Sequence, residues 1–433
     1  MRAGRPMGRR GMALAALLLA AGLAACGGSV HPATPQASPL PVWSAAADAG
    51  PQRIVVLSDI HLGVDDAFSQ TVQNRAMLVN FLDRLAVGPV DEIVLAGDIL
   101  DEWYLPATYP ASIDSMAFYR KVRANNAAVF AALGRIIDRG ITLTYVPGNH
   151  DLLLDAETLA DLLPGIRQAR DAPGLGTRQT GTRSEIVIEH GHRYDAGACP
   201  DPLSNKTITG SYPSTLPFGY FFTRRLATAI AEGKTDPKVT VPVVAGPTDG
   251  TDDALGAYAC YKLWAETITT YPISAGPDAR VFATPDGYDR AISVRDLLPF
   301  VQADGRLAGP LYADVQRRWT AVQAANRVAV KIPYATAVET AFDHTILDRA
   351  PFTKYLDVDP TVDLVVFGHS HVPLVTRLVR SGRRTADANS GTWIDQNTMG
   401  PTGTFVAIES GPRSTSIRVL QYHADGSLVT VAE

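Results

Sequence analysis

Charged side chains are scarce in this chain: Asp, Glu, Lys and Arg together make up 19% of its 433 residues. This low proportion excludes an intrinsically disordered chain and one that wraps nucleic acid with a strongly basic surface. The formal net charge is −5; because the first 25 residues hold four arginines and no acidic residue, the remainder carries −9. We therefore expect no nucleic-acid partner. A phosphorylated small molecule stays compatible with this charge, because bound metal ions supply positive charge locally.

Cysteine is also scarce, with three residues, Cys26, Cys199 and Cys260. Cys26 ends an apolar N-terminal segment and is set apart from the other two. The remaining pair predicts a disulfide in an oxidising compartment, and two separately buried thiols are the alternative. A bridge between them would stabilise the fold by roughly 3–4 kcal/mol.

The N-terminus has the features of a secretion signal, which we assign to residues 1–25. Four arginines accompany an apolar run, Met12–Ala25, that is too short to span a bilayer. The run ends in Leu23-Ala24-Ala25-Cys26, which resembles the bacterial lipoprotein cleavage box. That resemblance implies a lipid on the Cys26 thiol and a periplasm-facing protein anchored in the cell envelope. An ordinary secretory signal and twin-arginine export are the alternatives.

The rest of the chain divides into four segments. Residues 26–52 are rich in Pro, Ala, Ser and Gly and predict a flexible tether. Strand-like and helical runs alternate over 53–195, including one long helix predicted at Met116–Gly140. Residues 196–354 break this rhythm and predict a largely helical insertion or cap. Strand-like runs from Leu374 to Val431, within 355–433, predict a second sheet that closes the domain.

Polar residues follow five predicted strands: Arg53–Ser58, Glu92–Ala96, Ile141–Val146, Ser184–Glu189 and Asp363–Phe367. A strand–helix–strand pattern implies parallel pairing, which gathers these residues at the carboxyl edge of a sheet. Oxygen and imidazole ligands suit divalent or trivalent metals, and the lack of cysteine among them argues against a structural zinc site. The candidates are Asp59, His61, Asp98, Asn149, His150, His190, His369 and His371.

Spacing and position predict how some of these candidates are presented. Asp59 and His61 lie two residues apart, so along an extended strand their side chains point the same way. His369 and His371 repeat this spacing. Asn149 and His150 are both candidate ligands.

The motifs occur in a specific order. They are Asp59-x-His61, Gly97-Asp98-x-x-Asp101, Gly148-Asn149-His150-Asp151, His190-Gly191-His192 and Gly368-His369-x-His371. In this combination the sequence resembles the calcineurin-like metallophosphoesterases. The resemblance implies an α/β fold, a two-sheet αββα sandwich, whose two parts are residues 53–195 and 355–433. It implies no counterpart for the insertion at 196–354.

The resemblance also implies a dinuclear metal site that holds two divalent or mixed-valence metal ions, which could be Mn, Fe or Zn. One ion would be held by Asp59, His61, Asp98 and His371, and the other by Asp98, Asn149, His190 and His369. A hydroxide bridging the two ions would attack phosphorus. His150 would then act as general acid, oriented or charge-stabilised by Asp151 or Asp101.

The implied activity is hydrolysis of a phosphomonoester or phosphodiester on a small molecule or a lipid. The alternatives are a hydrolase of nucleotide- or lipid-linked pyrophosphates at the membrane, and a lipoprotein that binds a ligand without turnover. Within the insertion, Phe218–Arg225 combines aromatic residues with two arginines. It predicts either a helix start packed on the core with its arginines in solvent, or a substrate wall with arginine contacts to phosphate.

Overall fold

The protein's structure, a computed structural model, describes most of the chain after the N-terminal segment. The described residues are 38–43, 50–109, 115–205, 209, 214–233, 241, 243–247, 250–283, 288, 291–298, 300–301, 307–312, 314–341, 352–380 and 382–433. The predicted signal segment and Cys26 lie outside them. Residues Ala37–Glu433 group as one compact unit.

The first sheet has seven strands in the order β16-β15-β14-β1-β2-β3-β4. Its parallel half consists of β1 (Gln52–Leu57), β2 (Glu92–Ala96), β3 (Thr142–Val146) and β4 (Arg167–Gln168). Its antiparallel half consists of β14 (Thr404–Ser410), β15 (Thr415–Tyr422) and β16 (Leu428–Ala432). The central strands are apolar on both faces because both faces of the sheet are covered.

The second sheet has five strands in the order β12-β13-β11-β6-β5. They are β12 (Leu374–Arg380), β13 (Arg383–Asn389), β11 (Leu364–Phe367), β6 (Ile186–Ile188) and β5 (Arg178–Thr180). The sequence predicted that the C-terminal strands form one sheet of their own, but they are divided between the two sheets. β12 and β13 join the second sheet, whereas β14 pairs with β1 in the first. Apolar alternation identifies a strand but not its partner, and that is why the prediction was wrong.

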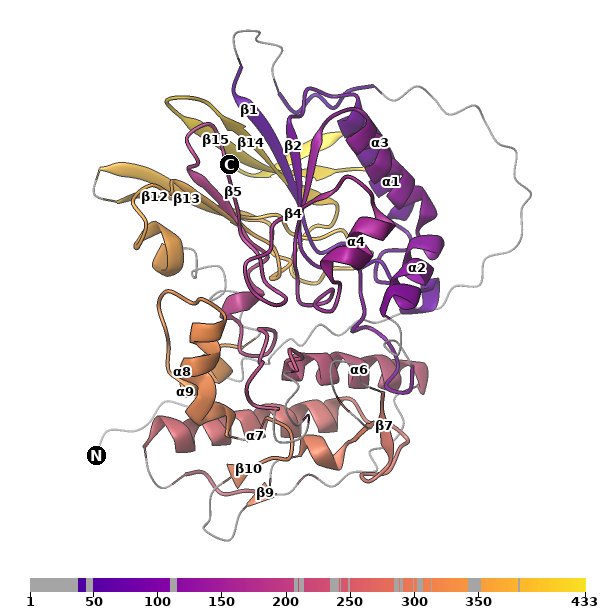
Figure 1. Ribbon diagram of the computed structural model, residues 1–433, viewed down its shortest axis with the longest axis vertical. Coiled ribbons are helices and arrows are strands. Elements are labelled where there is room, and N and C mark those ends of the chain that lie inside the picture. The colour runs from indigo at the N-terminus through magenta and orange to yellow at the C-terminus, as the bar shows by residue number, and fades with distance from the viewer. Residues whose placement is uncertain are drawn as a thin grey trace, which may run out of the picture. The chain divides into compact units, whose positions relative to one another are not determined.

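The two sheets pack face to face, and an apolar core between them joins Val56 and Val94 of the first sheet to Ile188 and Val366 of the second. A second core covers the outer face of the first sheet with four helices, which Figure 1 shows beside β1 and β2. These are α1 (Arg75–Ala86), α2 (Ser115–Asn125), α3 (Ala127–Asp138) and α4 (Ala156–Leu162), and a short helix η1 (Asp66–Phe68) precedes them. The predicted α/β two-sheet sandwich is confirmed. Among the described residues, the short helix η4 (Phe352–Leu356) contributes to the cover of the second sheet's outer face.

The long helix predicted at Met116–Gly140 is two helices that meet at Asn126. The Asn126 side-chain amide donates to the carbonyls of Val122, at 2.8 Å, and Gly63, at 2.9 Å. An asparagine side chain that bonds to backbone competes with the helical pattern, which explains the break.

Among the described residues of the insertion, helices predominate over strands, in agreement with the prediction. After η2 (His192–Tyr194) it contains α6 (Phe218–Ala231), α7 (Asp252–Thr270), α8 (Val315–Ala325), α9 (Tyr334–Glu339) and the short helix η3 (Arg295–Leu297). Two small antiparallel two-stranded sheets accompany them, made of β7 (Arg280–Phe282) with β8 (Ile292–Ser293) and β9 (Phe300–Val301) with β10 (Leu307–Ala308).

Two predictions about the chain need correction. Leu40 and Val42 are buried in the helix-covered core, so the packed part of the chain begins before the predicted end of the tether at residue 52. The thiols of Cys199 and Cys260 are both free, so the predicted disulfide does not form. Burial raises the pKa of both thiols, that of Cys260 to about 11.

Within the described residues, no helix has the length and apolar character needed to cross a bilayer.

Candidate metal centre

Carboxylate and imidazole groups from five strand ends meet at one place in the sandwich. Three groups of side chains each have ligand atoms within 4.8 Å of one another. They are Asp59, His61 and His371; His61, Asp98 and His150; and Asp98, His190 and His369. The strands β1, β2 and β3 come from the first sheet and β6 and β11 from the second. The site is therefore shared by the two sheets at their carboxyl ends.

The backbone at this site is strained. Asp59, His61, Asp98, His369 and His371 have φ values of 54°, 51°, 54°, 67° and 60°. This left-handed region is unfavourable for residues with a Cβ, and such conformations cluster where function requires them. Asp59 and His61 were predicted to lie along an extended strand, and so were His369 and His371. This prediction was wrong, because each strand ends before its pair. Backbone hydrogen bonds between neighbouring loops hold the conformation, such as the 2.9 Å bond from the amide of His61 to the carbonyl of Asp98.

Two motif glycines allow these loops to approach. A Cβ at Gly148 would collide with the amide and carboxylate of Asp98, and a Cβ at Gly368 would collide with the side chains of Ser58 and Asp59. A side chain at either position would therefore displace a candidate ligand. This is the physical reason for glycine beside the ligand residues in both motifs.

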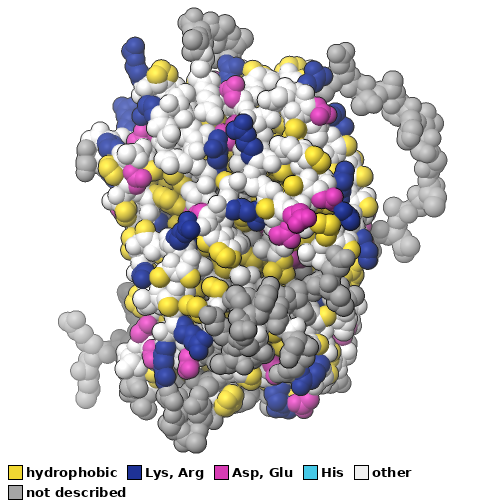
Figure 2. Space-filling model, viewed as in Figure 1, with side chains coloured by type: hydrophobic (Ala, Val, Ile, Leu, Met, Phe, Trp, Pro, Cys, Tyr) yellow, Lys and Arg dark blue, Asp and Glu magenta, His cyan; other side chains and the backbone are white. Residues whose placement is uncertain are grey.

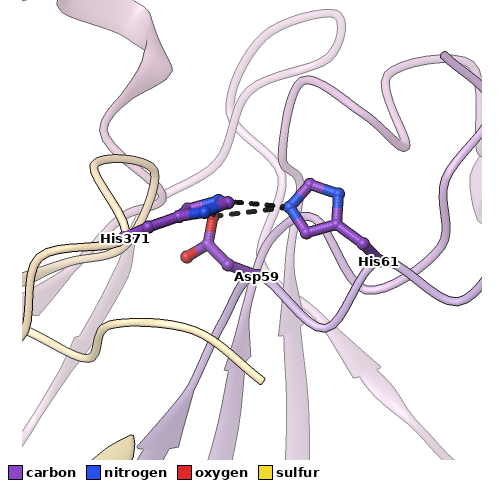
Figure 3. A group of neighbouring side chains, drawn as sticks. All are labelled: Asp59, His61 and His371. Atoms are coloured by element: carbon purple, nitrogen blue, oxygen red, sulfur yellow. Dashed lines mark hydrogen bonds and ion pairs between the residues drawn. The ribbon is translucent and has the colours of Figure 1, made fainter. Parts of the chain in front are cut away.

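The first group faces inward from two distant parts of the chain. Figure 3 shows Asp59, His61 and His371 pointing toward one another. His371 Nε2 lies 3.1 Å from Asp59 Oδ1 and 3.3 Å from His61 Nε2. His61 Nε2 lies 3.9 Å from Asp59 Oδ1.

The third group, Asp98, His190 and His369, is joined to the first through Asp98, which also lies near His61 of the first group. Asp98 Oδ2 lies 3.2 Å from His190 Nε2 and 3.8 Å from His61 Nε2. His190 Nε2 also lies 3.2 Å from Asn149 Oδ1. Asp98 thus lies between His61 and His190. The side chains of the first and third groups are almost fully buried, except those of His369 and His371.

Hydrogen bonds at Nδ1 fix the ring orientation of two of these histidines. His190 Nδ1 donates to the carbonyl of Ala96 at 2.8 Å, and His61 Nδ1 donates to Asp101 Oδ2 at 3.0 Å. The neutral form of each ring therefore turns a lone pair at Nε2 toward the carboxylate of Asp98. Lone pairs and carboxylate oxygens directed at a common region repel unless positive charge lies among them. Buried oxygen and nitrogen donors of this kind fit divalent metal ions.

The electrostatics of the cluster agree with that fit. Burial alone would lower the pKa of His190, but the carboxylates of Asp98 and Asp59 raise it to about 9. Burial would raise the pKa of Asp98, but the imidazoles of His190 and His150 hold it well below its usual value. The site therefore stabilises positive charge among its carboxylates, whether a proton or a metal ion carries it.

His150 lies beside this cluster and is held from two sides. Its Nδ1 lies 3.0 Å from Asp101 Oδ1, and the indole of Trp103 stacks on its ring at 4.7 Å between centroids and 27° between planes. Asp101 thus bonds to His150 with one oxygen and to His61 with the other. Burial would lower the pKa of His150, but Asp101 and Asp98 raise it to about 9.

Asp151, the other carboxylate considered for orienting His150, is engaged elsewhere. Its two oxygens accept from the amides of Ile99, at 2.9 Å, and Gly148, at 2.7 Å. Asp151 therefore ties the loop after β3 to the loop after β2. Asn149 is 2% exposed and its Oδ1 faces His190, so the two neighbours in this motif have different surroundings.

The comparison with protein families bears on this site. A family model described as calcineurin-like phosphoesterase matches residues 52–267, about half of the chain. The chain belongs to this family. It is a metal-dependent phosphoester hydrolase, and four of the five ligand-bearing strand ends lie inside the matched residues.

Other comparisons are more distant. Among solved structures, this phosphoesterase is similar to a dimetal phosphatase from Danio rerio with 12% sequence identity and a TM-score of 0.34, over 88% of this chain and 99% of that chain. No curated protein matches the sequence. Family membership therefore rests on the family model and on the residues of the site.

Three features of this phosphoesterase were not predicted from its sequence. Trp103 stacks on His150, and its place two residues after the motif residue Asp101 is a signal in the sequence that could have pointed to it. Asp195 Oδ2 lies 3.1 Å from His369 Nε2 and orients that ring. His192, which the motif places in the cluster, instead bonds to the carbonyl of Gly174 at 3.0 Å through Nε2.

A further feature is the contact between the insertion and the loop that carries Trp103. Neither prediction for Phe218–Arg225 describes the two arginines, which lie in α6 and are 0% and 2% exposed. Arg224 donates to the carbonyls of Ala107 and Tyr109, at 3.1 and 2.7 Å, and Arg225 to that of Ile268 at 3.0 Å. The loop that carries Trp103 is therefore fastened to α6. Among the described contacts, these guanidinium groups serve the packing of the insertion rather than a phosphate.

Proposed function

We propose that this chain is a dinuclear-metal phosphoesterase that hydrolyses a phosphomonoester or a phosphodiester. The observation that supports it best is the pair of ligand groups that share Asp98, with imidazole lone pairs and carboxylates facing a common region. Asp59, His61, Asp98 and His371 would hold one ion, and Asp98, Asn149, His190 and His369 the other. Mn, Fe and Zn all suit this mixture of oxygen and imidazole donors.

When bound, such a pair of ions would neutralise the phosphoryl oxygens and supply a nucleophile from water at neutral pH. The remaining chemistry belongs to His150. Because its Nδ1 bonds to Asp101, only Nε2 is left to give a proton to the leaving oxygen. Its side chain is 16% exposed, which leaves that nitrogen within reach of a substrate.

Asp101 and Trp103 position this general acid. Asp101 fixes the tautomer through Nδ1, and the stacked indole limits rotation of the ring. Because Asp101 also bonds to His61, the acid and one ligand are held by the same buried carboxylate. A general acid fixed in this way stays within hydrogen-bond reach of the leaving oxygen.

The proposed setting is the bacterial cell envelope. Lipidation of Cys26 would anchor the protein to a membrane on its periplasmic side, and the substrate would be a phosphorylated small molecule or lipid. The apolar run and the residues that precede Cys26 support this proposal.

The function is tested with protein reconstituted separately with Mn, Fe and Zn. Aryl phosphomonoesters, aryl phosphodiesters and nucleotide pyrophosphates are assayed with and without a chelator. We expect chelator-sensitive turnover of a monoester or diester. Preferential cleavage of a pyrophosphate would replace the proposed substrate class, and no chelator-sensitive turnover of any substrate would favour a binding protein.

A further inference from the structure

A cavity of about 950 Å³ lies at the opposite end of the second sheet from the metal centre. Its lining includes residues just before β6 and β11 and the first residues of β13. The ligand histidines follow the other ends of β6 and β11. Five residue steps along β11 and its flanks correspond to roughly 16 Å, so the cavity is separate from the catalytic cluster.

The cavity is lined by an excess of positive charge. Asp363 is the one carboxylate among its described lining residues, and it pairs with Arg183 at 3.1 Å and with Arg383 at 2.9 Å. Glu185 lies buried beside Arg183 and adds a second negative charge nearby. The guanidinium groups number five: Arg183, Arg377, Arg383, Arg384 and Arg413. We refer to this feature as the arginine cleft.

Three of these arginines are exposed and lack a carboxylate partner among the described residues. Arg377 donates to the carbonyl of Ile417 at 3.1 Å, whereas no ion pair is described for Arg384 or Arg413. Their charge is therefore not neutralised within the described chain. Guanidinium groups bind phosphate oxygens with paired donors, so phosphate is the anion best suited to this cleft.

The cleft also exposes apolar side chains. Val379 is 72% exposed and Leu378 is 38% exposed, and both lie on the edge strand β12 within the lining. Figure 2 shows Lys and Arg side chains near hydrophobic ones over the region of β12 and β13, at the upper left of the view. A small soluble anion would leave Val379 in water. A bilayer surface offers phosphate groups and apolar chains together.

We propose that the arginine cleft docks the phosphate headgroups of anionic phospholipids, with Leu378 and Val379 at the membrane interface. The charge of the cleft is complementary to such a surface although the protein as a whole carries −5. Docking in this way turns the opposite, metal-binding edge of the sandwich away from the bilayer, toward soluble phosphoesters.

A lipid on Cys26 would not by itself produce this orientation. Residues 26–37 precede the packed segment at Leu40, and a chain of that length spans up to about 40 Å when extended. An anchor at Cys26 therefore does not by itself select the face of the protein that meets the membrane. A second contact through the arginine cleft selects one face.

The proposal is tested by vesicle co-sedimentation of the full chain carrying Cys26→Ser, so that no acyl group contributes to binding. Vesicles contain equal parts of phosphatidylglycerol and phosphatidylcholine, or phosphatidylcholine alone. We expect binding only to the anionic vesicles, weakened by added salt. The double variant Arg384→Glu/Arg413→Glu is expected to bind more weakly by on the order of 30-fold. Val379→Ser is expected to give a smaller loss.

The matched control is Arg123→Glu/Arg139→Glu, which changes the net charge equally at two exposed arginines outside the cleft. It should bind anionic vesicles nearly as well as the parent chain. An equal loss in the control, or equal binding to neutral vesicles, would overturn the proposal. Titration with inorganic phosphate separates the sources: binding of free phosphate without vesicle binding would also overturn it. Unchanged turnover of a soluble phosphoester shows that each variant is folded and keeps this test separate from the catalytic proposal.

Discussion

The two ends of the second sheet carry different ionisable groups in opposite surroundings. At the carboxyl ends of β6 and β11, imidazoles and carboxylates are mostly buried, fixed by hydrogen bonds and placed on strained backbone. At the amino ends, exposed guanidinium groups of Arg377, Arg384 and Arg413 stand on ordinary backbone among apolar side chains.

This difference reflects what each end must hold. Metal ions and a phosphoryl group need donors fixed within a fraction of an ångström, and the fold supplies that by burial and by residues in the left-handed region. A lipid surface is fluid, so long exposed arginines that adapt to it are sufficient. Substitutions at the carboxyl end should therefore have large effects on turnover, and those at the amino end should have almost none.

The largest effect is expected for Asp98→Asn. This change keeps the size of the side chain but removes the charge shared by the two ligand groups. We expect turnover to fall by about 10³-fold or more, because stabilisation by the metal ions depends on that carboxylate. Elemental analysis should find fewer metal ions per chain. Asp161→Asn, at an exposed aspartate paired with Arg120, is the control and should retain both metal and activity.

The next effect is expected for His150→Gln. Loss of a general acid lowers kcat by about 10²–10⁴-fold, with the metal content unchanged. The decrease should be greater for an alkyl phosphate than for a nitrophenyl phosphate, since a good leaving group needs no proton. A variant that retains full activity, or loses it equally for both leaving groups, would contradict the role assigned to His150.

Much of this carboxyl end was predictable from the sequence, because its signals are local. Each candidate ligand follows an apolar run, and the motif order distinguishes the set from chance. The conformation of Asp59 and His61 was not predictable in this way, because their left-handed backbone depends on bonds to the loop of Asp98, a distant part of the chain. The stacking of Trp103 on His150 depends in the same way on a contact between two loops.

The division of the C-terminal strands between two sheets shows the same limit at the level of the fold. β12 and β14 have similar strand-like sequences, yet one pairs with β13 and the other with β1. Their partners are set by packing across the sandwich and not by their own periodicity. The arginine cleft could not be predicted from the sequence for the same reason, because it brings together Arg183, Arg383 and Arg413 from separate parts of the chain.

A moderate effect is expected at Trp103, which lies between the catalytic edge and the insertion. Aromatic stacking contributes about 0.5–1.5 kcal/mol, so Trp103→Leu should lower kcat by up to about tenfold through misplacement of His150. KM should change little. Trp103→Phe retains an aromatic face and should recover most of the rate. A loss that appears only as a lower melting temperature, with kcat unchanged, would show that the indole serves packing against Tyr220 alone.

The smallest effect is expected for the arginine cleft when the substrate is soluble. In Arg384→Glu/Arg413→Glu, four units of charge change at the amino ends, yet the catalytic edge is separated from them by roughly 16 Å of strand. Salt at physiological strength screens exposed charges beyond about 8 Å, so kcat and KM for a soluble phosphoester should stay within about twofold of the parent values. The same variant should bind anionic vesicles far more weakly. Turnover that fell together with vesicle binding would show that the two ends of the sheet are coupled, and the comparison between a fixed catalytic edge and an independent docking edge would fail.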